Sequence, residues 1–364
     1  MSILIFFLVL FVIVLVHEWG HFITAKKTGM RVDEFGFGFP PKLFGVKKGE
    51  TEYTFNALPL GGFVKILGEN GDEDISKLSA EDKKRTFSSR PKWAQAIVLV
   101  AGVFMNVVLA WVLFTASYMI GVDVPVDEAE AGPAAKLVIA GTLPDSPAKE
   151  VPPGAEVVSI KGADGVIEHP KLTQFREVVS TTAPHPVVVT YKLGDKTKTV
   201  EITPRSGLDE TNPERYLIGV SLLMTQVERE SFLAAVKDGF VTTWYGLKNI
   251  TTGLWKLVRD AFVGEADFSQ VAGPVGIVGM VGTAAHQGLT NLLTFTAVIS
   301  LNLAVINLLP FPALDGGRLL FVAIEAVTRR RIPPEWASRI NLLGFALLML
   351  LMIAVTYNDI IKLL

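Results

Sequence analysis

The sequence contains no cysteine, which excludes disulfide bonds, iron–sulfur clusters, cysteine nucleophiles and cysteine-bound zinc. Charged residues are scarce, at 19% of 364 residues, and the formal net charge of −2 shows no basic excess. Nucleic-acid binding normally requires such an excess, so no nucleic acid is expected as a partner. Any metal ion in this protein must be held by histidine, aspartate or glutamate.

Apolar residues, in contrast, make up half of the sequence and gather in long runs. Four runs reach the roughly 20 residues that a helix needs to cross a hydrocarbon core. They predict a polytopic α-helical membrane protein in a lipid bilayer, with about four transmembrane helices at residues 3–24, 94–120, 290–310 and 336–357. The first run carries no preceding cation, no cleavage site and an internal polar cluster, so we expect a retained helix.

The cations gather at particular ends of these runs: Lys26, Lys27 and Arg31 after the first, Lys83, Lys84, Arg85, Arg90 and Lys92 before the second, and Arg329, Arg330 and Arg331 after the third. The positive-inside rule then predicts that residues 25–93 and the turn 329–339 are cytoplasmic. Both termini and the segment 121–289 are expected on the other side.

The segment from about 129 to 205 has its own pattern of short strand-like runs around one helix-like run. Its stretch "GTLPDSPAKEVPPGAEVVSIKG" resembles the PDZ family, which implies a small α+β domain. Such a domain can bind an extended peptide or the C-terminus of another protein as an added strand. A spacer or size filter that binds no peptide is the alternative.

Apolar residues then recur at steps of three and four between Phe232 and Val258, which predicts an amphipathic helix. The expected organisation is an N-terminal membrane part (1–128, with a cytoplasmic loop and membrane-associated β-hairpin at 25–93), the PDZ-like domain (129–205), an extracytoplasmic amphipathic helix with loops (206–289) and a C-terminal membrane part (290–364).

Candidate catalytic and metal-binding residues lie inside the first run, in "VLVHEWGHFIT". His17 and His21 stand four residues apart, so on a helix they face the same way, as two ligands of one metal must. Glu18 is offset by about 100°, which suits a general base beside the metal. A chance match on a surface helix is the alternative, but ionisable residues within a span are costly and are kept mainly where they pair, bind or react.

A catalytic zinc usually has three protein ligands, so a third is required. His169, His185 and His286 fall in the outer segment, whereas His17 and His21 are expected roughly 10 Å inside the cytoplasmic end of their helix. Asp315 is the remaining candidate, because it is the only acidic residue between Asp267 and Glu325. A tight turn would explain "LDGG" equally well, and spacing alone leaves both interpretations open.

The motifs "HEWGHF" at 17–22 and "NLLPFPALDG" at 307–316 together resemble the site-2 protease family of intramembrane zinc metalloproteases. Further stretches resemble its bacterial branch that includes the regulator of sigma-E protease: "FGFGFPPKLF" (35–44), "LPLGGFVKILGE" (58–69), "AGVFMN" (101–106) and "AGPVGI" (272–277). The best-known members carry two tandem PDZ domains, whereas this sequence has room for one.

The resemblance implies one zinc ion held by His17, His21 and Asp315, Glu18 as the catalytic base, and Asn307 as a substrate-binding residue in a bacterial cytoplasmic membrane. It also implies regulated intramembrane proteolysis of single-pass membrane proteins, such as a trimmed anti-sigma factor or a signal-peptide remnant.

The stretch 54–67 shows strand-like alternation, and we expect a hairpin edge at Gly61 and Gly62 that binds an unwound substrate strand. An ordinary turn at these glycines is the alternative. For the whole protein, an inert membrane scaffold or chaperone that binds substrate tails and a transporter are the competing functions.

Overall fold

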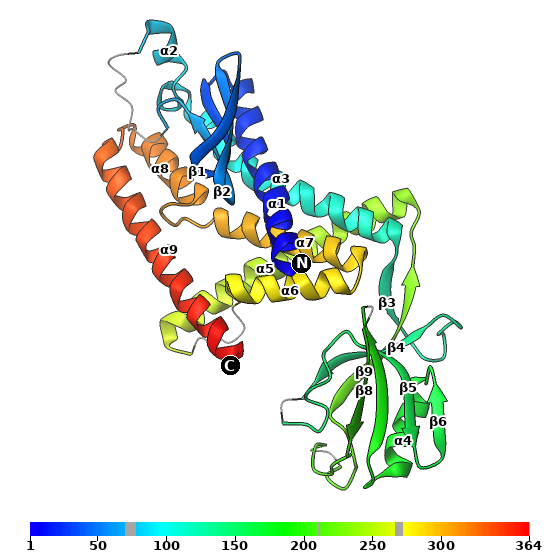
Figure 1. The fold of residues 1–364 in the computed structure, drawn as a ribbon. Helices are drawn as coiled ribbons and strands as arrows, with labels where there is room; N and C mark the ends of the chain where they lie inside the picture. Colours follow the sequence, from blue (N-terminus) through cyan, green and yellow to red (C-terminus); the bar gives the residue numbers. More distant parts are fainter. Residues whose placement is uncertain (70–77, 144, 195, 210–211, 266–271, 364) are drawn as a thin grey trace. The chain divides into compact units, whose positions relative to one another are not determined.

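The computed structural model describes residues 1–69, 78–143, 145–194, 196–209, 212–265 and 272–363 (Figure 1). The protein divides into two compact units. The first comprises Met1–Thr115, Ala235–Gly282 and Leu293–Leu364, and the second comprises Ala116–Ala234 and Thr283–Leu292.

Within the described ranges, four helices are long and apolar enough to cross a membrane. They are α1 (Ser2–Lys27), α3 (Lys92–Ile120), α7 (Leu289–Asn307) and α9 (Pro334–Leu363). The prediction of about four apolar spans is therefore confirmed. Of these helices α3 is the most enclosed and α9 the most exposed.

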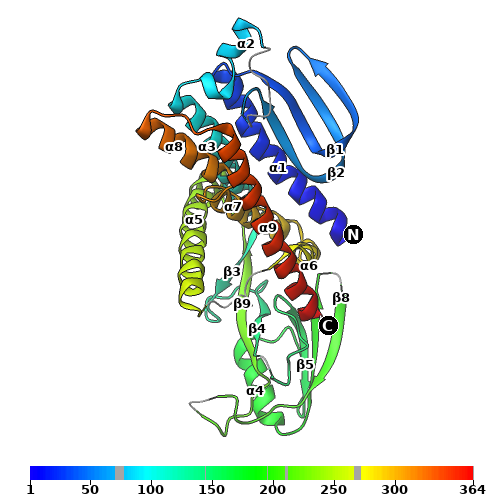
Figure 2. The ribbon, with the colours of Figure 1, turned by 90° about the vertical axis from the view of Figure 1, so that its left-hand side faces the viewer.

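A long antiparallel pair, β1 (Val32–Lys48) and β2 (Thr51–Ile66), follows α1 and lies alongside it (Figures 1 and 2). The strands curl, because the first part of β1 pairs with β2 twice: Phe35 is opposite both Tyr53 and Val64. Gly61 and Gly62 are both assigned to β2, but β2 itself reverses direction between residues 55 and 62, because Phe37 is opposite both Phe55 and Gly62. A separate reversal at residues 49–50 joins β1 to β2.

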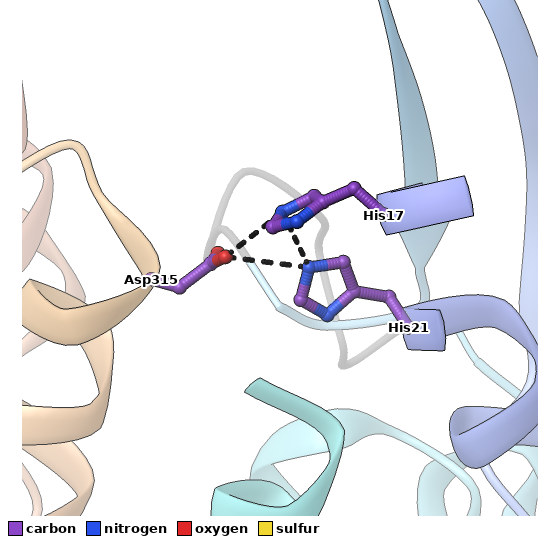
Figure 3. A group of neighbouring side chains, drawn as sticks. All are labelled: His17, His21 and Asp315. Carbon is purple, nitrogen blue, oxygen red and sulfur yellow. Dashed lines mark hydrogen bonds and ion pairs between the residues drawn. The ribbon is translucent and has the colours of Figure 1, made fainter. Parts of the chain in front are cut away.

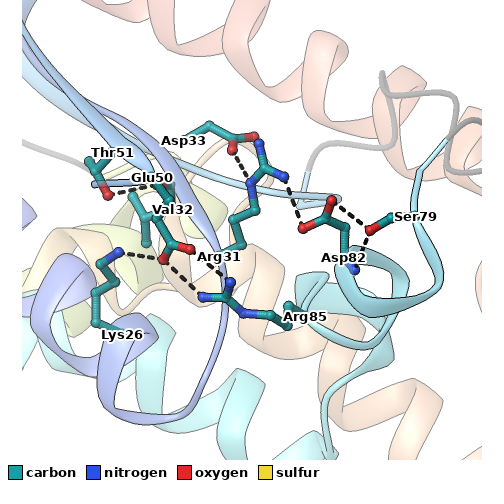
Figure 4. A network of polar contacts seen from close by, with 9 residues as sticks. All are labelled: Lys26, Arg31, Val32, Asp33, Glu50, Thr51, Ser79, Asp82 and Arg85. Atoms are coloured by element: carbon teal, nitrogen blue, oxygen red, sulfur yellow. Dashed lines mark hydrogen bonds and ion pairs between the residues drawn. The ribbon is translucent and has the colours of Figure 1, made fainter. Parts of the chain in front are cut away.

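A network of ion pairs fixes the base of this strand pair (Figure 4). Both carboxylate oxygens of Glu50 accept hydrogen bonds from Arg85, which follows α2 (Ala80–Lys84), and Lys26 at the end of α1 donates to the same carboxylate at 2.5 Å. Arg31 pairs with Asp33 at 2.7 Å and with Asp82 at 2.9 Å. The end of α1, the turn at Glu50 and the loop around α2 are thereby tied together.

The second unit contains a β-rich region between the second and third spans. Its strands are β3 (Val122–Val126), β4 (Lys136–Thr142), β5 (Glu156–Gly162), β6 (Gly165–Glu168), β7 (Val187–Leu193), β8 (Lys196–Ile202) and β9 (Val220–Glu228). They form one antiparallel sheet in the order β3-β9-β4-β5-β7-β8, with β6 paired to β5. Helix α4 (Leu172–Thr182) packs on it, and Phe175, Ile160 and Val189 lie in the buried core.

Three more helices complete the described residues. The amphipathic stretch forms α5 (Phe232–Val263), as its periodicity predicts. No helix was predicted at α6 (Pro274–His286), whose glycines weaken the helical pattern. The buried carboxylate of Asp359 on α9 accepts hydrogen bonds from Gly273 N and Gly276 N, which caps the start of α6. The last of the three helices, α8 (Asp315–Thr328), begins at Asp315, the residue predicted as the third metal ligand.

Candidate metal centre

His17 and His21 lie one turn apart on α1, and both are buried. Their Nε2 atoms are 3.1 Å apart and point toward Asp315 of α8 (Figure 3). Oδ2 of Asp315 lies 3.1 Å from Nε2 of His17 and 3.4 Å from Nε2 of His21. The structure therefore brings together the three side chains that sequence analysis proposed as ligands, although Asp315 lies 298 residues from His17.

The break between α7 and α8 places Asp315. Helix α7 ends at Asn307, and residues 308–314 form an irregular loop before α8 starts. Gly316 and Gly317 are buried in the first turn of α8, where a Cβ atom would overlap the carbonyl groups of Leu308 and Phe311. These glycines therefore let the loop fold tightly against the helix start, which fixes the Asp315 carboxylate beside α1.

The three donor atoms fit a zinc ion. In a tetrahedral site with bonds of about 2.0–2.1 Å, neighbouring ligand atoms are roughly 3.3–3.4 Å apart. The observed separations of 3.1, 3.1 and 3.4 Å are close to that geometry. Two imidazole nitrogens and one carboxylate oxygen are a donor set that zinc accepts, and among the described residues no other group of three histidine or acidic side chains has this proximity.

Helix α3 forms one wall of this centre. Gly102 lies against both imidazoles, and a Cβ atom there would be 2.8 Å from Cε1 of His17. The Val98 carbonyl accepts a hydrogen bond from Nδ1 of His21 at 2.8 Å. The buried Asn106 amide lies against Nδ1 of His17, at 3.2 Å. Sequence analysis assigned no role to these residues, although a lone asparagine within an apolar span was the available signal.

Glu18 opens onto a cavity of about 540 Å³ that His21, Asp315 and Gly62 also line. A Cβ atom on Gly62 would be 3.3 Å from Cγ of Glu18, so the backbone of β2 passes close to the predicted base. Gly61 contacts the Phe39 ring instead and does not line the cavity.

An ion pair closes the same cavity at the far end of β2. Arg318, one turn after Asp315 on α8, pairs with the Glu69 carboxylate three residues beyond β2. Both side chains line the cavity.

Asn307 at the end of α7 places its Nδ2 atom 3.5 Å from Nε2 of His17, at the limit of a hydrogen bond. Sequence analysis found Asn307 but not the ion pair.

Two histidines and a carboxylate around one point, with a glutamate in the adjoining cavity, define a site of the metalloprotease class. The comparisons with known proteins agree with this class. The family model described as Peptidase family M50 matches residues 5–351. The protein therefore belongs to peptidase family M50, the site-2 proteases, and is an intramembrane zinc metalloprotease.

Similar proteins cover almost the whole sequence. A Clostridium perfringens protein that is provisionally named a zinc metalloprotease is 39% identical over 96% of this sequence and 95% of its own length. Zinc metalloprotease RasP of Geobacillus kaustophilus is 30% identical over 99% of this sequence and 98% of its own. Regulator of sigma-W protease RasP of Bacillus subtilis is 30% identical over 100% of this sequence and 99% of its own length. Membership of an enzyme family sets aside the scaffold and transporter alternatives.

Proposed function

We propose that this protease hydrolyses a peptide bond within or near the transmembrane segment of membrane-anchored substrates, with zinc held by His17, His21 and Asp315. The observation that carries the proposal is the triangle of donor atoms, with sides of 3.1, 3.1 and 3.4 Å, formed between an apolar span and the start of α8. Zinc in such a site supplies Lewis-acid activation of water and of the scissile carbonyl.

Glu18 acts as the general base and then as the general acid. It opens onto the cavity that His21 and Asp315 line, so it can take a proton from the attacking water and return it to the leaving amine. Asn307, beside His17, has an amide that can hydrogen-bond to the substrate backbone.

A substrate helix must unwind before it can be cut, because its carbonyl groups are occupied by hydrogen bonds. The register of β1 and β2 supports a place for the unwound segment. Residues 34–37 pair with 52–55 on one side, and residues 32–37 pair with 62–66 on the other, which makes 62–66 an outer strand in the described part of the pair. Gly62, Phe63 and Val64 of this strand line the cavity, so a substrate strand added there would lie beside Glu18.

For the β-rich region we propose a PDZ-like peptide-binding domain on the extracytoplasmic side. A groove of about 670 Å³ runs between α4 and the segment leading into β9. Phe175 and Val179 of α4 line it together with Ile218, Leu222 and Arg215. An apolar groove between a helix and a strand is the arrangement that receives an added peptide strand or the C-terminus of another protein. A size filter remains the alternative.

Two contacts support a cytoplasmic position for both 25–93 and the turn 329–339. Lys92 at the start of α3 forms an ion pair with Glu325 of α8, and Arg331 contacts Ser88 O at 3.4 Å. The cation-rich segments thus share one end of unit 1, as the positive-inside rule requires. The location we propose is a bacterial cytoplasmic membrane, with both termini and the PDZ-like domain outside.

The relative named regulator of sigma-W protease suggests the substrate class. We propose single-pass membrane proteins whose outer part has been removed, such as a trimmed anti-sigma factor or a signal-peptide remnant.

Zinc content and a base variant test the proposal. Purified protein is expected to contain one zinc per molecule, and His17→Ala and Asp315→Ala are expected to lose it. Glu18→Gln is expected to keep zinc and bind substrate while cleavage falls by about 10²–10⁴-fold. The exposed Glu81→Gln is the control for loss of one carboxylate. Normal turnover by Glu18→Gln would rule out Glu18 as the base.

A further inference from the structure

Helix α3 contacts the outer ring nitrogen of each histidine. Nδ1 of His21 hydrogen-bonds to the Val98 carbonyl at 2.8 Å, and Nδ1 of His17 lies 3.2 Å from the amide of Asn106. The Nε2 atoms of both rings point the other way, toward Asp315. The two contacts differ in one respect: a backbone carbonyl can only accept, whereas a side-chain amide can donate or accept.

Metal binding at Nε2 decides which role Asn106 must play. An imidazole that binds a metal through Nε2 carries its proton on Nδ1, and that N–H almost always donates to an oxygen. Val98 supplies this oxygen to His21. In the structure, Nδ2 of Asn106 faces Nδ1 of His17, while its Oδ1 atom is buried without a hydrogen-bond partner. That orientation fits a His17 ring protonated on Nε2, the tautomer that cannot bind metal through Nε2.

A half-turn of the amide exchanges its oxygen and nitrogen with almost no change of shape. In the orientation shown, Oδ1 has no hydrogen-bond partner among the described residues, so no hydrogen bond at Oδ1 holds the amide in that orientation and the proton on His17 determines which orientation is favoured. The backbone of Asn106 is held in place independently, because Ser300 of α7 donates a hydrogen bond to its carbonyl at 2.8 Å.

We propose that Asn106 is a positioning residue of the zinc centre, whose Oδ1 accepts the Nδ1–H of His17 and thereby fixes the metal-binding tautomer and orientation of that ring. The inference rests on the proposed zinc site. Asn106 is fully buried and reaches His17 from a different helix, so it holds the ligand without contacting the reacting atoms.

Zinc affinity of the purified full-length protein, measured by competition with a chelator of known affinity, tests this role. Asn106→Leu keeps the size of the side chain but removes the acceptor, and its zinc affinity is expected to fall by about 10–100-fold. Asn106→Asp keeps an acceptor and is expected to remain within a few-fold of wild type. Ser300→Ala removes a buried hydrogen bond at the same helix crossing without touching His17, and its zinc affinity is expected to be unchanged.

Thermal unfolding of the three metal-free variants shows whether each is folded. Wild-type affinity in Asn106→Leu would overturn the proposal, as would equal losses in folded Asn106→Leu and Asn106→Asp, because a donating amide would then be the important group. If Asn106→Asp does not fold, the ¹⁵N chemical shifts of the histidine rings in zinc-loaded wild type decide: an unprotonated Nδ1 on His17 overturns the proposal. Wild-type protein without zinc would instead refute the proposed function itself.

Discussion

Gly102 of α3 lies so close to His21 of α1 that a single methyl group on Gly102 would overlap the Nε2 atom of the ring. The same methyl would be 2.8 Å from Cε1 of His17. On the other side of this crossing, a Cβ atom on Gly20 would overlap the carbonyl of Ala101. The two helices therefore approach as closely as they do because each has a glycine at the contact, and this approach places α3 directly against both imidazoles.

Gly102→Ala is expected to displace the imidazoles, since neither ring has room to move away from α3 without leaving Asp315. We expect overpacking to lower the free energy of unfolding by about 1–3 kcal/mol and zinc affinity to fall at least tenfold. Thermal unfolding and metal analysis measure the two effects. Gly253→Ala on α5, where a Cβ atom meets nothing within 4 Å, is the matched control and is expected to bind zinc normally. Full zinc binding by Gly102→Ala would contradict the packing argument.

The ion pair between Glu69 and Arg318 is expected to hold the end of β2 against α8. The Glu69 side chain is only 9% exposed, so removal of Arg318 leaves a poorly hydrated carboxylate. We expect Glu69→Gln and Arg318→Met to be destabilising separately, and the double variant to be less destabilised than their sum, with a coupling of about 0.5–3 kcal/mol. Unfolding midpoints of the four proteins measure this coupling. Additive effects would show that the pair does not join the two segments.

Stability is expected to depend on pH through Glu50. The hydrogen bond from Arg85 is the largest cause that lowers the pKa of the Glu50 carboxyl to about 2; partial burial opposes it, and Lys26 adds to it. Because this pKa is lower in the folded than in the unfolded state, the ionised carboxylate stabilises the fold above a pH of about 4.5, and this stabilisation is lost as pH falls toward 2.

Glu50→Gln should therefore be less stable than wild type at pH 7, by on the order of 1 kcal/mol for such a partly exposed pair, and equally stable near pH 2. Thermal unfolding of both proteins across this range is the measurement, with the exposed Glu214→Gln as the control for loss of one charge. A constant difference at every pH would contradict the assignment.

The absence of cysteine makes the proposed orientation easy to test, because any introduced cysteine is the only one. Asp164→Cys, in the exposed turn between β5 and β6, is expected to react with a membrane-impermeant maleimide added to intact cells. Ala80→Cys, at the exposed start of α2, is expected to react only after the membrane is permeabilised. The reverse pattern would invert the topology and place the β-rich region in the cytoplasm.

The β2 strand shows where sequence reasoning was limited. Alternation predicted a strand-like segment near residues 54–67, and this was correct because alternation is set by neighbouring residues. The same local pattern could not decide whether Gly61 and Gly62 form a turn or a strand, since glycine suits both. Only the pairing with β1 shows that Gly62 lies opposite Phe37, directly after β2 has reversed direction between residues 55 and 62.

The sequence by itself determined the apolar spans, the absence of cysteine ligands, and the shared face of His17 and His21, because a helix of 3.6 residues per turn places positions four apart side by side. The family resemblance already named Asp315, but only the tertiary structure places its carboxylate beside the two histidines and shows which residues surround them. Asp315 reaches the histidines through the loop after α7, and Gly102 and Asn106 meet them across a helix crossing. Such contacts depend on how helices pack, and packing is not a property of any local stretch of sequence.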